Sequence, residues 1–153
     1  MAAVRLNPDN DQTGGFCAKH DFNGDTTLSG GAVASSYGDV AFTNLPHVIG
    51  QRTGRGQNFV NAGTAGTRDG YTMVEGHEYS ETITDQNPAG GWTAASGQES
   101  ADKCAWLSPS TRGGARNVGR GNDTYTEQGS WCNDTNAATT AIRSSATAAA
   151  ATS

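Results

Sequence analysis

Apolar residues are sparse along this chain, and only one segment repeats them at helical spacing. Between residues 69 and 85 they recur every three or four positions, which places them on one side of a helix. Asp69 is a candidate N-cap, and Thr72 with Glu75 forms an alternative capping box. Pro88 and the glycines behind it end the segment. We expect one helix over 69–85, with a buried face made of Thr72, Gly76, Tyr79 and Ile83.

The other apolar runs are too short for helices and predict strands. Strands are expected at 39–43, 46–49, 58–61 and 125–131. Residues 98–104 predict a short helix or turn, and the Gly/Arg/Asn-rich stretch 108–123 predicts a loop. One helix with a few short strands predicts an α+β fold with a short mixed sheet and long glycine-rich loops.

Composition places the chain among loop-rich extracellular domains, because only 34% of its 153 residues are hydrophobic and 21 are glycine. Residues 1–135 are expected to form one domain, and the Ala/Thr/Ser-rich residues 136–153 a low-complexity tail. The net charge of −5 and the lack of a dense basic stripe argue against nucleic acid as a partner. No apolar run is long enough to cross a membrane.

The strongest chemical signal is the H-E-x-x-E sequence of residues 77–81, one residue away from the H-E-x-x-H signature of zinc metallopeptidases. Positions i and i+4 share a helix face, so His77 and Glu81 could hold one metal ion at the edge of a cleft. Glu78 points about 100° round the helix axis. It would be a carboxylate beside the metal, where a general base for water is needed.

A site of this kind needs a third protein ligand. Glu99 and Asp102 lie three residues apart, so on a helical turn one could ligate the metal while the other orients a ligand. Gly90-Gly91 gives the chain a tight return toward the helix, and Asp85 could form a hydrogen bond near the site or cap the helix end. One histidine with two carboxylates favours zinc, with manganese, iron and calcium as alternatives.

Two further features have less specific interpretations. Residues 21–25 begin like a calcium loop, but Ala32 stands where a bidentate acid is required, so a turn rich in Asx residues is expected. His20 could approach the metal site, although a surface position is the expectation for it. Three cysteines allow one disulfide and one free thiol. A disulfide together with few lysines favours an oxidising compartment, although residues 1–8 lack the apolar core of a signal peptide.

Longer segments around the motif resemble a family of secreted bacterial zincin-like proteins. The shared pattern is a helix H-E-x-x-E-x-x-T-D, a G-W turn and a segment G-x-E-x-x-D-x-C-A-W, found here at residues 76–85, 91–92 and 97–106. Flanking pieces match at 16–20, 37–46, 58–61 and 128–131. The family is itself distantly similar to the plant phosphate-induced, exordium-like secreted proteins, in which the metal motif is eroded.

The resemblance implies a metallopeptidase-like domain that acts on peptides or proteins. Its metal ligands would be His77, Glu81 and either Glu99 or Asp102, with Glu78 as the base. Arg55 stands where the family has a cysteine, so Cys17 loses its usual partner, and the best remaining disulfide is Cys104–Cys132. The family also has additional strands before the piece at 16–20, so the domain is expected to be truncated at its N-terminus.

Three hypotheses for function follow from these observations. The first is a secreted metal-dependent peptidase-like hydrolase that uses a metal-activated water. The second is a secreted protein whose metal site is structural or vestigial. The third is a self-assembling structural protein in which Gly/Thr-rich strands associate.

Overall fold

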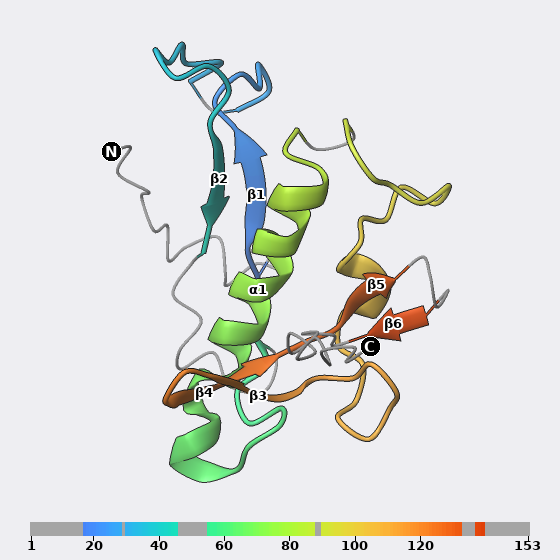
Figure 1. The fold of residues 1–153 in the computed structure, drawn as a ribbon. Helices are drawn as coiled ribbons and strands as arrows, with labels where there is room; N and C mark the ends of the chain where they lie inside the picture. The colour runs from blue at the N-terminus through green and yellow to red at the C-terminus, as the bar shows by residue number, and fades with distance from the viewer. Residues whose placement is uncertain (1–16, 29, 46–54, 88–89, 133–136, 140–153) are drawn as a thin grey trace, which may run out of the picture.

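A computed structural model describes residues 17–28, 30–45, 55–87, 90–132 and 137–139 of the chain. One α-helix, α1 (Asp69–Thr84), runs through the middle of this described part (Figure 1). The strands around it are β1 (Lys19–Phe22), β2 (Ala41–Asn44), β3 (Arg116–Arg120), β4 (Asp123–Glu127), β5 (Ser130–Cys132) and β6 (Ala137–Thr139). Two short 3-10 helices, η3 (Gly63–Arg68) and η4 (Asp102–Cys104), complete the described elements.

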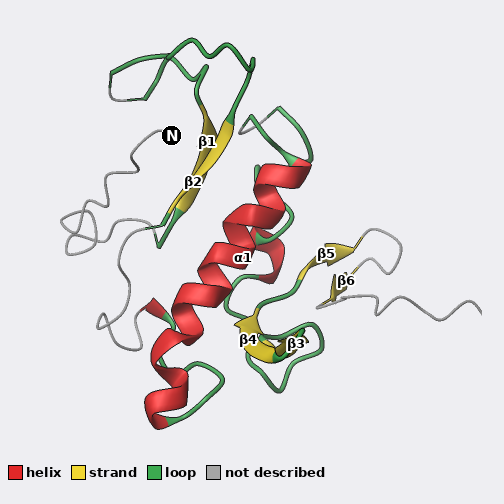
Figure 2. Ribbon diagram, turned by 60° about the vertical axis from the view of Figure 1, so that its left-hand side comes forward, coloured by secondary structure: helices red, strands yellow, loops and turns green. Residues whose placement is uncertain are grey.

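The strands form three separate antiparallel pairs, β1–β2, β3–β4 and β5–β6. Figure 2 shows the β1–β2 pair on one side of α1 and the other two pairs on the opposite side, and in Figure 1 the β3–β4 pair passes across the lower part of α1. The α+β class is confirmed. The expected short mixed sheet is not, because the described strands pair only antiparallel and only two at a time.

The helix begins and ends where its sequence signals predicted, but it buries a different face. Tyr79 and Ile83 of the predicted buried face are 63% and 66% exposed. The buried side chains instead include Met73, Val74, Glu78 and Glu81. Periodicity identified the apolar side of the helix as the buried one. The side that carries Glu78 and Glu81 is buried instead, because strand β1 and residues 99–102 supply polar partners for these two carboxylates.

The start of α1 is fixed by Asp69, although this residue is not the N-cap that the sequence suggested. Asp69 is the first helical residue and Arg68 precedes it as the cap. The Asp69 carboxylate accepts hydrogen bonds from the backbone N–H groups of Val60 and Asn61 at 2.8 and 2.7 Å. These amides point at a carboxylate and not at a neighbouring strand, so the strand predicted at 58–61 is wrong: the segment is a chain of turns and bends.

The remaining strand predictions have mixed outcomes. The segment at 39–43 corresponds to β2, and the one at 125–131 is divided between β4 and β5. The prediction of a loop over 108–123 is wrong for residues 116–120, because they form β3 and pair with β4 along the whole strand. Residues 46–49 lie outside the described residues, as does the predicted tail apart from β6. In the described part of the chain, we find no helix with the length and apolar character needed to span a bilayer.

The cysteines do not pair as the resemblance implied. Cys104 is fully buried and is a free thiol, so the expected Cys104–Cys132 disulfide is absent. Burial raises the pKa of the Cys104 thiol. Cys17 is also free, and Arg55, the residue in place of its expected partner, donates a guanidinium N–H to its sulfur at 3.1 Å.

Candidate metal centre

The chain returns to α1 directly after the helix ends, as the glycines there predicted. The Asp85 carboxylate accepts the backbone N–H groups of Gly90 and Gly91 at 3.0 and 2.6 Å. A side chain at Gly91 would place its Cβ 2.4 Å from the Thr84 carbonyl oxygen, so glycine is required at this close approach. Asp85 is also the C-cap residue of α1, because its backbone N–H donates to the Glu81 carbonyl at 2.6 Å, while its side chain ties the loop to the helix.

This return brings the segment around residue 100 against the C-terminal half of α1. The backbone N–H of Asp102 donates to Glu81 Oε1 at 3.2 Å, and the hydroxyls of Thr84 and Ser100 lie 3.2 Å apart. The Ser100 carbonyl accepts the N–H of Trp131 at 2.9 Å, so the segment is held from β5 as well. The predicted approach of Glu99 and Asp102 to the H-E-x-x-E helix is therefore present in the structure.

The His77 cluster consists of His77, Glu81 and Asp102. His77 Nε2 lies 3.2 Å from Glu81 Oε1 and 3.5 Å from Asp102 Oδ1. Donor atoms of these three residues lie within 4.8 Å of one another, an arrangement that could hold a metal ion. Asp102, not Glu99, is the acid that joins this cluster. Its side chain is 43% exposed and His77 is 15% exposed, so the cluster opens to solvent.

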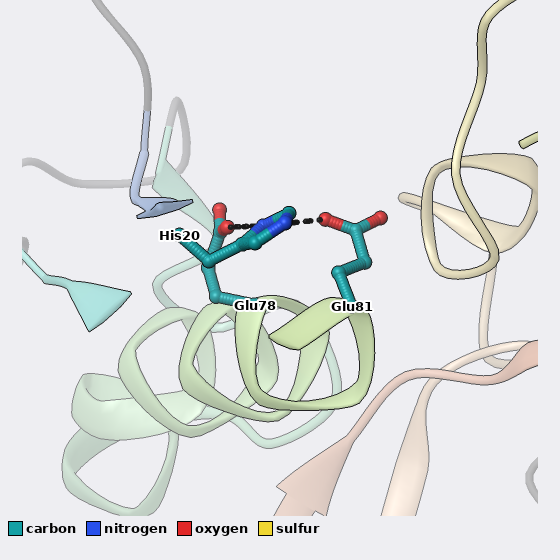
Figure 3. Close-up of side chains that lie close together, drawn as sticks. All are labelled: His20, Glu78 and Glu81. Carbon is teal, nitrogen blue, oxygen red and sulfur yellow. Dashed lines mark hydrogen bonds and ion pairs between the residues drawn. The ribbon is translucent and has the colours of Figure 1, made fainter. Parts of the chain in front are cut away.

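The His20 cluster consists of His20, Glu78 and Glu81, and sequence reasoning gave it too little weight. Figure 3 shows the imidazole of His20 between the two carboxylates, with Nδ1 at 3.4 Å from Glu78 Oε2 and 3.6 Å from Glu81 Oε2. The surface position expected for His20 is wrong, because the residue is only 6% exposed. Strand β1 packs along α1 and carries His20 onto the motif. In the sequence, the resemblance of the segment at 16–20 to the family pattern was the signal for this position.

The hydrogen bond on the far side of the His20 ring sets its tautomer. Nε2 lies 3.0 Å from the backbone carbonyl oxygen of Asp85, so it must carry the proton and donate it. In the neutral ring Nδ1 then presents a lone pair toward Glu78 and Glu81. A lone pair that faces two carboxylates is unfavourable unless a proton or a cation lies between them. A histidine that binds a metal through one nitrogen typically donates a hydrogen bond from its other nitrogen to an acceptor such as a backbone carbonyl, as Nε2 does here.

The nitrogen–oxygen distances in both clusters are closer to those between two ligands of one cation than to those of a charge-assisted hydrogen bond. Charge-assisted N–H···O bonds are about 2.7–2.9 Å long. Two donor atoms bound at about 2.0–2.2 Å to one tetrahedral ion are separated by about 3.3–3.6 Å. The separations of 3.4 and 3.6 Å around His20, and of 3.2 and 3.5 Å around His77, lie close to that range.

Negative charge gathers at the site. Within the described residues, the four carboxylates Glu78, Glu81, Glu99 and Asp102 form ion pairs only with the two histidines. Burial raises the pKa of Glu78, and burial together with the charge of Glu81 raises the pKa of Glu99 to about 7. Burial lowers the pKa of His77, but its hydrogen bond to Glu81 and the neighbouring carboxylates raise it overall. Such shifts indicate a site where a cation would be stabilised.

Glu99 lies beside the His20 cluster but outside the His77 cluster. Its Oε1 is 3.3 Å from His20 Nε2, yet this buried oxygen has no hydrogen-bond partner in the structure. Because the Nε2 proton of His20 is directed at the Asp85 carbonyl, Glu99 has an electrostatic contact with His20 but no hydrogen bond to it. The donor set of two imidazoles, several carboxylates and one unsatisfied buried oxygen fits a divalent metal ion.

Gln128 contacts His77 from outside the H-E-x-x-E motif. Its Nε2 lies 3.0 Å from His77 Nδ1 and donates to the Ala101 carbonyl at 3.2 Å. A histidine that binds a metal through one nitrogen usually donates the N–H of the other nitrogen to an acceptor. If the Gln128 amide is rotated by 180°, its side-chain oxygen faces His77 Nδ1 and is that acceptor. We expect Gln128→Leu to weaken cation binding by about 10–100-fold.

The Gln128→Leu prediction is measured by titrating Zn²⁺ into metal-free protein with a competing chelator. Gln98→Leu is the matched control, because Gln98 is exposed on the loop before Glu99. Equal affinities for the Gln128→Leu protein and the wild type would show that Gln128 does not support His77.

The calcium loop considered at residues 21–25 is instead a set of turns. Asp25 accepts the backbone N–H and the hydroxyl of Thr27 at 2.7 and 2.8 Å, and Asn23 binds the backbone at Val33 and Val40. These side chains are engaged within the loop, and they are absent from the clusters that could hold a metal among the described residues. The expected turn rich in Asx residues is confirmed.

No protein-family model, curated protein or solved structure matches this chain. Its function is therefore inferred from its own residues and their geometry.

Proposed function

We propose that this protein is a secreted metal-dependent peptidase-like hydrolase whose metal centre lies on α1. The observation that supports the proposal best is the position of Glu81, whose carboxylate lies between two imidazoles at 3.2 and 3.6 Å. The resemblance of the H-E-x-x-E segment to the zincin-like family agrees with this geometry. In the proposed site His77, Glu81 and Asp102 hold the cation, with zinc as the first candidate.

Each part of the proposed site has a distinct task. A bound divalent cation would polarise a substrate carbonyl and lower the pKa of a bound water. His77 and Asp102 face solvent, so the substrate would approach from their side. Glu78 follows His77 on the next position of the helix, and its raised pKa suits a group that takes a proton from water and passes it to a leaving amine. His20 Nδ1 lies 3.4 Å from Glu78 Oε2, so a proton or cation between these two atoms would link them.

The direct test of this proposal is Glu78→Gln, which keeps the side-chain shape and removes the proton-accepting charge. We expect hydrolysis of an unstructured protein such as casein to fall by about 10²–10⁴-fold, because a positioned general base contributes about that much. Glu75→Gln is the matched control, since Glu75 is exposed on the same helix one turn earlier. The peptidase proposal is wrong if the Glu78→Gln protein hydrolyses casein at the wild-type rate.

A second candidate is a secreted metal-binding protein without catalytic activity. The observation in its favour is the burial of Glu78, which is 6% exposed and faces His20, so that protein groups surround it on the buried side. Structural metal sites are closed by protein ligands in this way, whereas catalytic sites keep an open position. Stoichiometric metal without hydrolysis of any peptide substrate, in wild type and Glu78→Gln alike, would favour this second function.

A further inference from the structure

The two oxygens of the Glu81 carboxylate face two different histidines. Oε1 lies toward His77 Nε2 at 3.2 Å, and Oε2 lies toward His20 Nδ1 at 3.6 Å. Each histidine is accompanied by a second carboxylate of its own, Asp102 at 3.5 Å on one side and Glu78 at 3.4 Å on the other. Glu81 is therefore shared by two complete sets of donor atoms.

We propose that the site binds two divalent cations, bridged by the Glu81 carboxylate. One lies in the His77 cluster and the second in the His20 cluster, which contains His20, Glu78 and Glu81. The inference rests on the proposed function for the first cation and adds the second. A carboxylate that binds one cation through each oxygen is a typical bridge in two-metal hydrolytic sites, where the cations lie about 3.5–4 Å apart.

Charge balance supports two cations over one. When Glu78, Glu81, Glu99 and Asp102 are all ionised and both imidazoles are neutral, as metal binding requires, the region carries four negative charges that two divalent cations would balance. In the described residues no lysine or arginine pairs with any of the four. Burial of the His20 cluster makes this balance more important, because its three members are 6%, 6% and 3% exposed and unpaired buried charge is costly.

The second cation changes the task of Glu78. With one cation bound, the Glu78 carboxylate is free to accept a proton from water. With both bound, it would be a ligand in the His20 cluster, and the two cations would supply the lowered pKa of a bound water. Donors of mixed nitrogen and oxygen type suit zinc or manganese at both positions.

The decisive experiment is the metal-binding stoichiometry of the 153-residue chain. Metal-free protein is dialysed against buffered Zn²⁺, and bound metal is measured by elemental analysis. We expect two equivalents in the wild type and one each in His20→Gln and Asp102→Asn, with two retained in the control Glu75→Gln. Circular dichroism and the thermal transition check that each variant is folded, and Glu78→Gln provides a second, more conservative test of the His20 cluster.

Manganese gives an independent readout that does not depend on activity. Two Mn²⁺ ions bridged by one carboxylate are magnetically coupled, so we expect the six-line spectrum of isolated Mn²⁺ to be lost at saturation in the wild type and to remain in His20→Gln. One equivalent of metal in the wild type, with an uncoupled manganese spectrum, would overturn the second site and leave the proposed hydrolase intact. Two equivalents without hydrolysis would overturn the hydrolase and leave the two-cation site intact.

Discussion

Glu81→Gln should abolish both cation binding and hydrolysis, the largest functional effect expected from a single change in this protein. Glu81 is 3% exposed and is the one residue common to both clusters. Glutamine keeps its volume but provides only one neutral oxygen, so it cannot serve two cations or offset their charge. Loss of a ligand also removes the chemistry that depends on the metal, and we expect hydrolysis to fall to background.

Thermal unfolding with and without Zn²⁺ measures this effect without a substrate. A ligand that binds only the folded state, present at a concentration of a hundred times its Kd, adds about 2.7 kcal/mol to the free energy of unfolding. For a domain of this size, this corresponds to a rise in Tm of about 5–10 °C. We expect this rise in the wild type and in Glu75→Gln, and none in Glu81→Gln. An equal rise in Glu81→Gln would show that the cation binds elsewhere on the chain.

The sequence predicted the parts of this site that depend on local spacing. His77 and Glu81 are one helical turn apart, and the signals for the start and end of α1 were sufficient to place them on one face. The return of the chain could also be predicted, because Gly91 permits the close approach to Thr84 that a larger residue would prevent. Asp102 followed from the same reasoning, although the sequence left it as an alternative to Glu99.

The parts that sequence reasoning missed depend on contacts between distant segments. His20 and Glu78 are 58 residues apart, and Gln128 lies 51 residues from His77. No periodic pattern reports such pairs, since it describes only neighbours within one element. The same limit explains why the prediction chose the wrong buried face of α1. Tyr79 and Ile83 lie on its apolar side, but Glu78 and Glu81 on the other side are buried because they have polar partners there.

Asp69→Asn should cause the largest loss of stability, about 1.5–3 kcal/mol in the free energy of unfolding, because it removes the charged acceptor and leaves some of the buried donors facing an NH2 group. The Asp69 carboxylate is 2% exposed and accepts hydrogen bonds from Val60 N, Asn61 N, Asn61 Nδ2 and Thr126 Oγ1 at 2.7–2.8 Å. These bonds tie the loop before η3, the start of α1 and strand β4 together. Urea unfolding in the presence of a chelator measures the loss, with exposed Asp123→Asn as the matched control.

The pH dependence of this effect distinguishes a charged acceptor from simple packing. Burial alone would raise the pKa of Asp69, but the hydrogen bonds from Asn61, Val60 and Thr126 outweigh it and lower the pKa below its ordinary value. The folded state thus binds the Asp69 proton more weakly than the unfolded state does. The contribution of Asp69 is complete above about pH 4 and is lost as the pH falls through the lower folded value.

Wild type and Asp69→Asn should therefore differ most in urea midpoint near pH 7 and converge on acidification below about pH 4. A constant difference from pH 7 to pH 3 would show that the charge of Asp69 is not what holds these segments. The expected loss also reaches the metal centre, because β4 ends at Glu127, next to Gln128, and Gln128 supports His77. A loosened β4 should weaken cation binding even though Asp69 is itself no ligand.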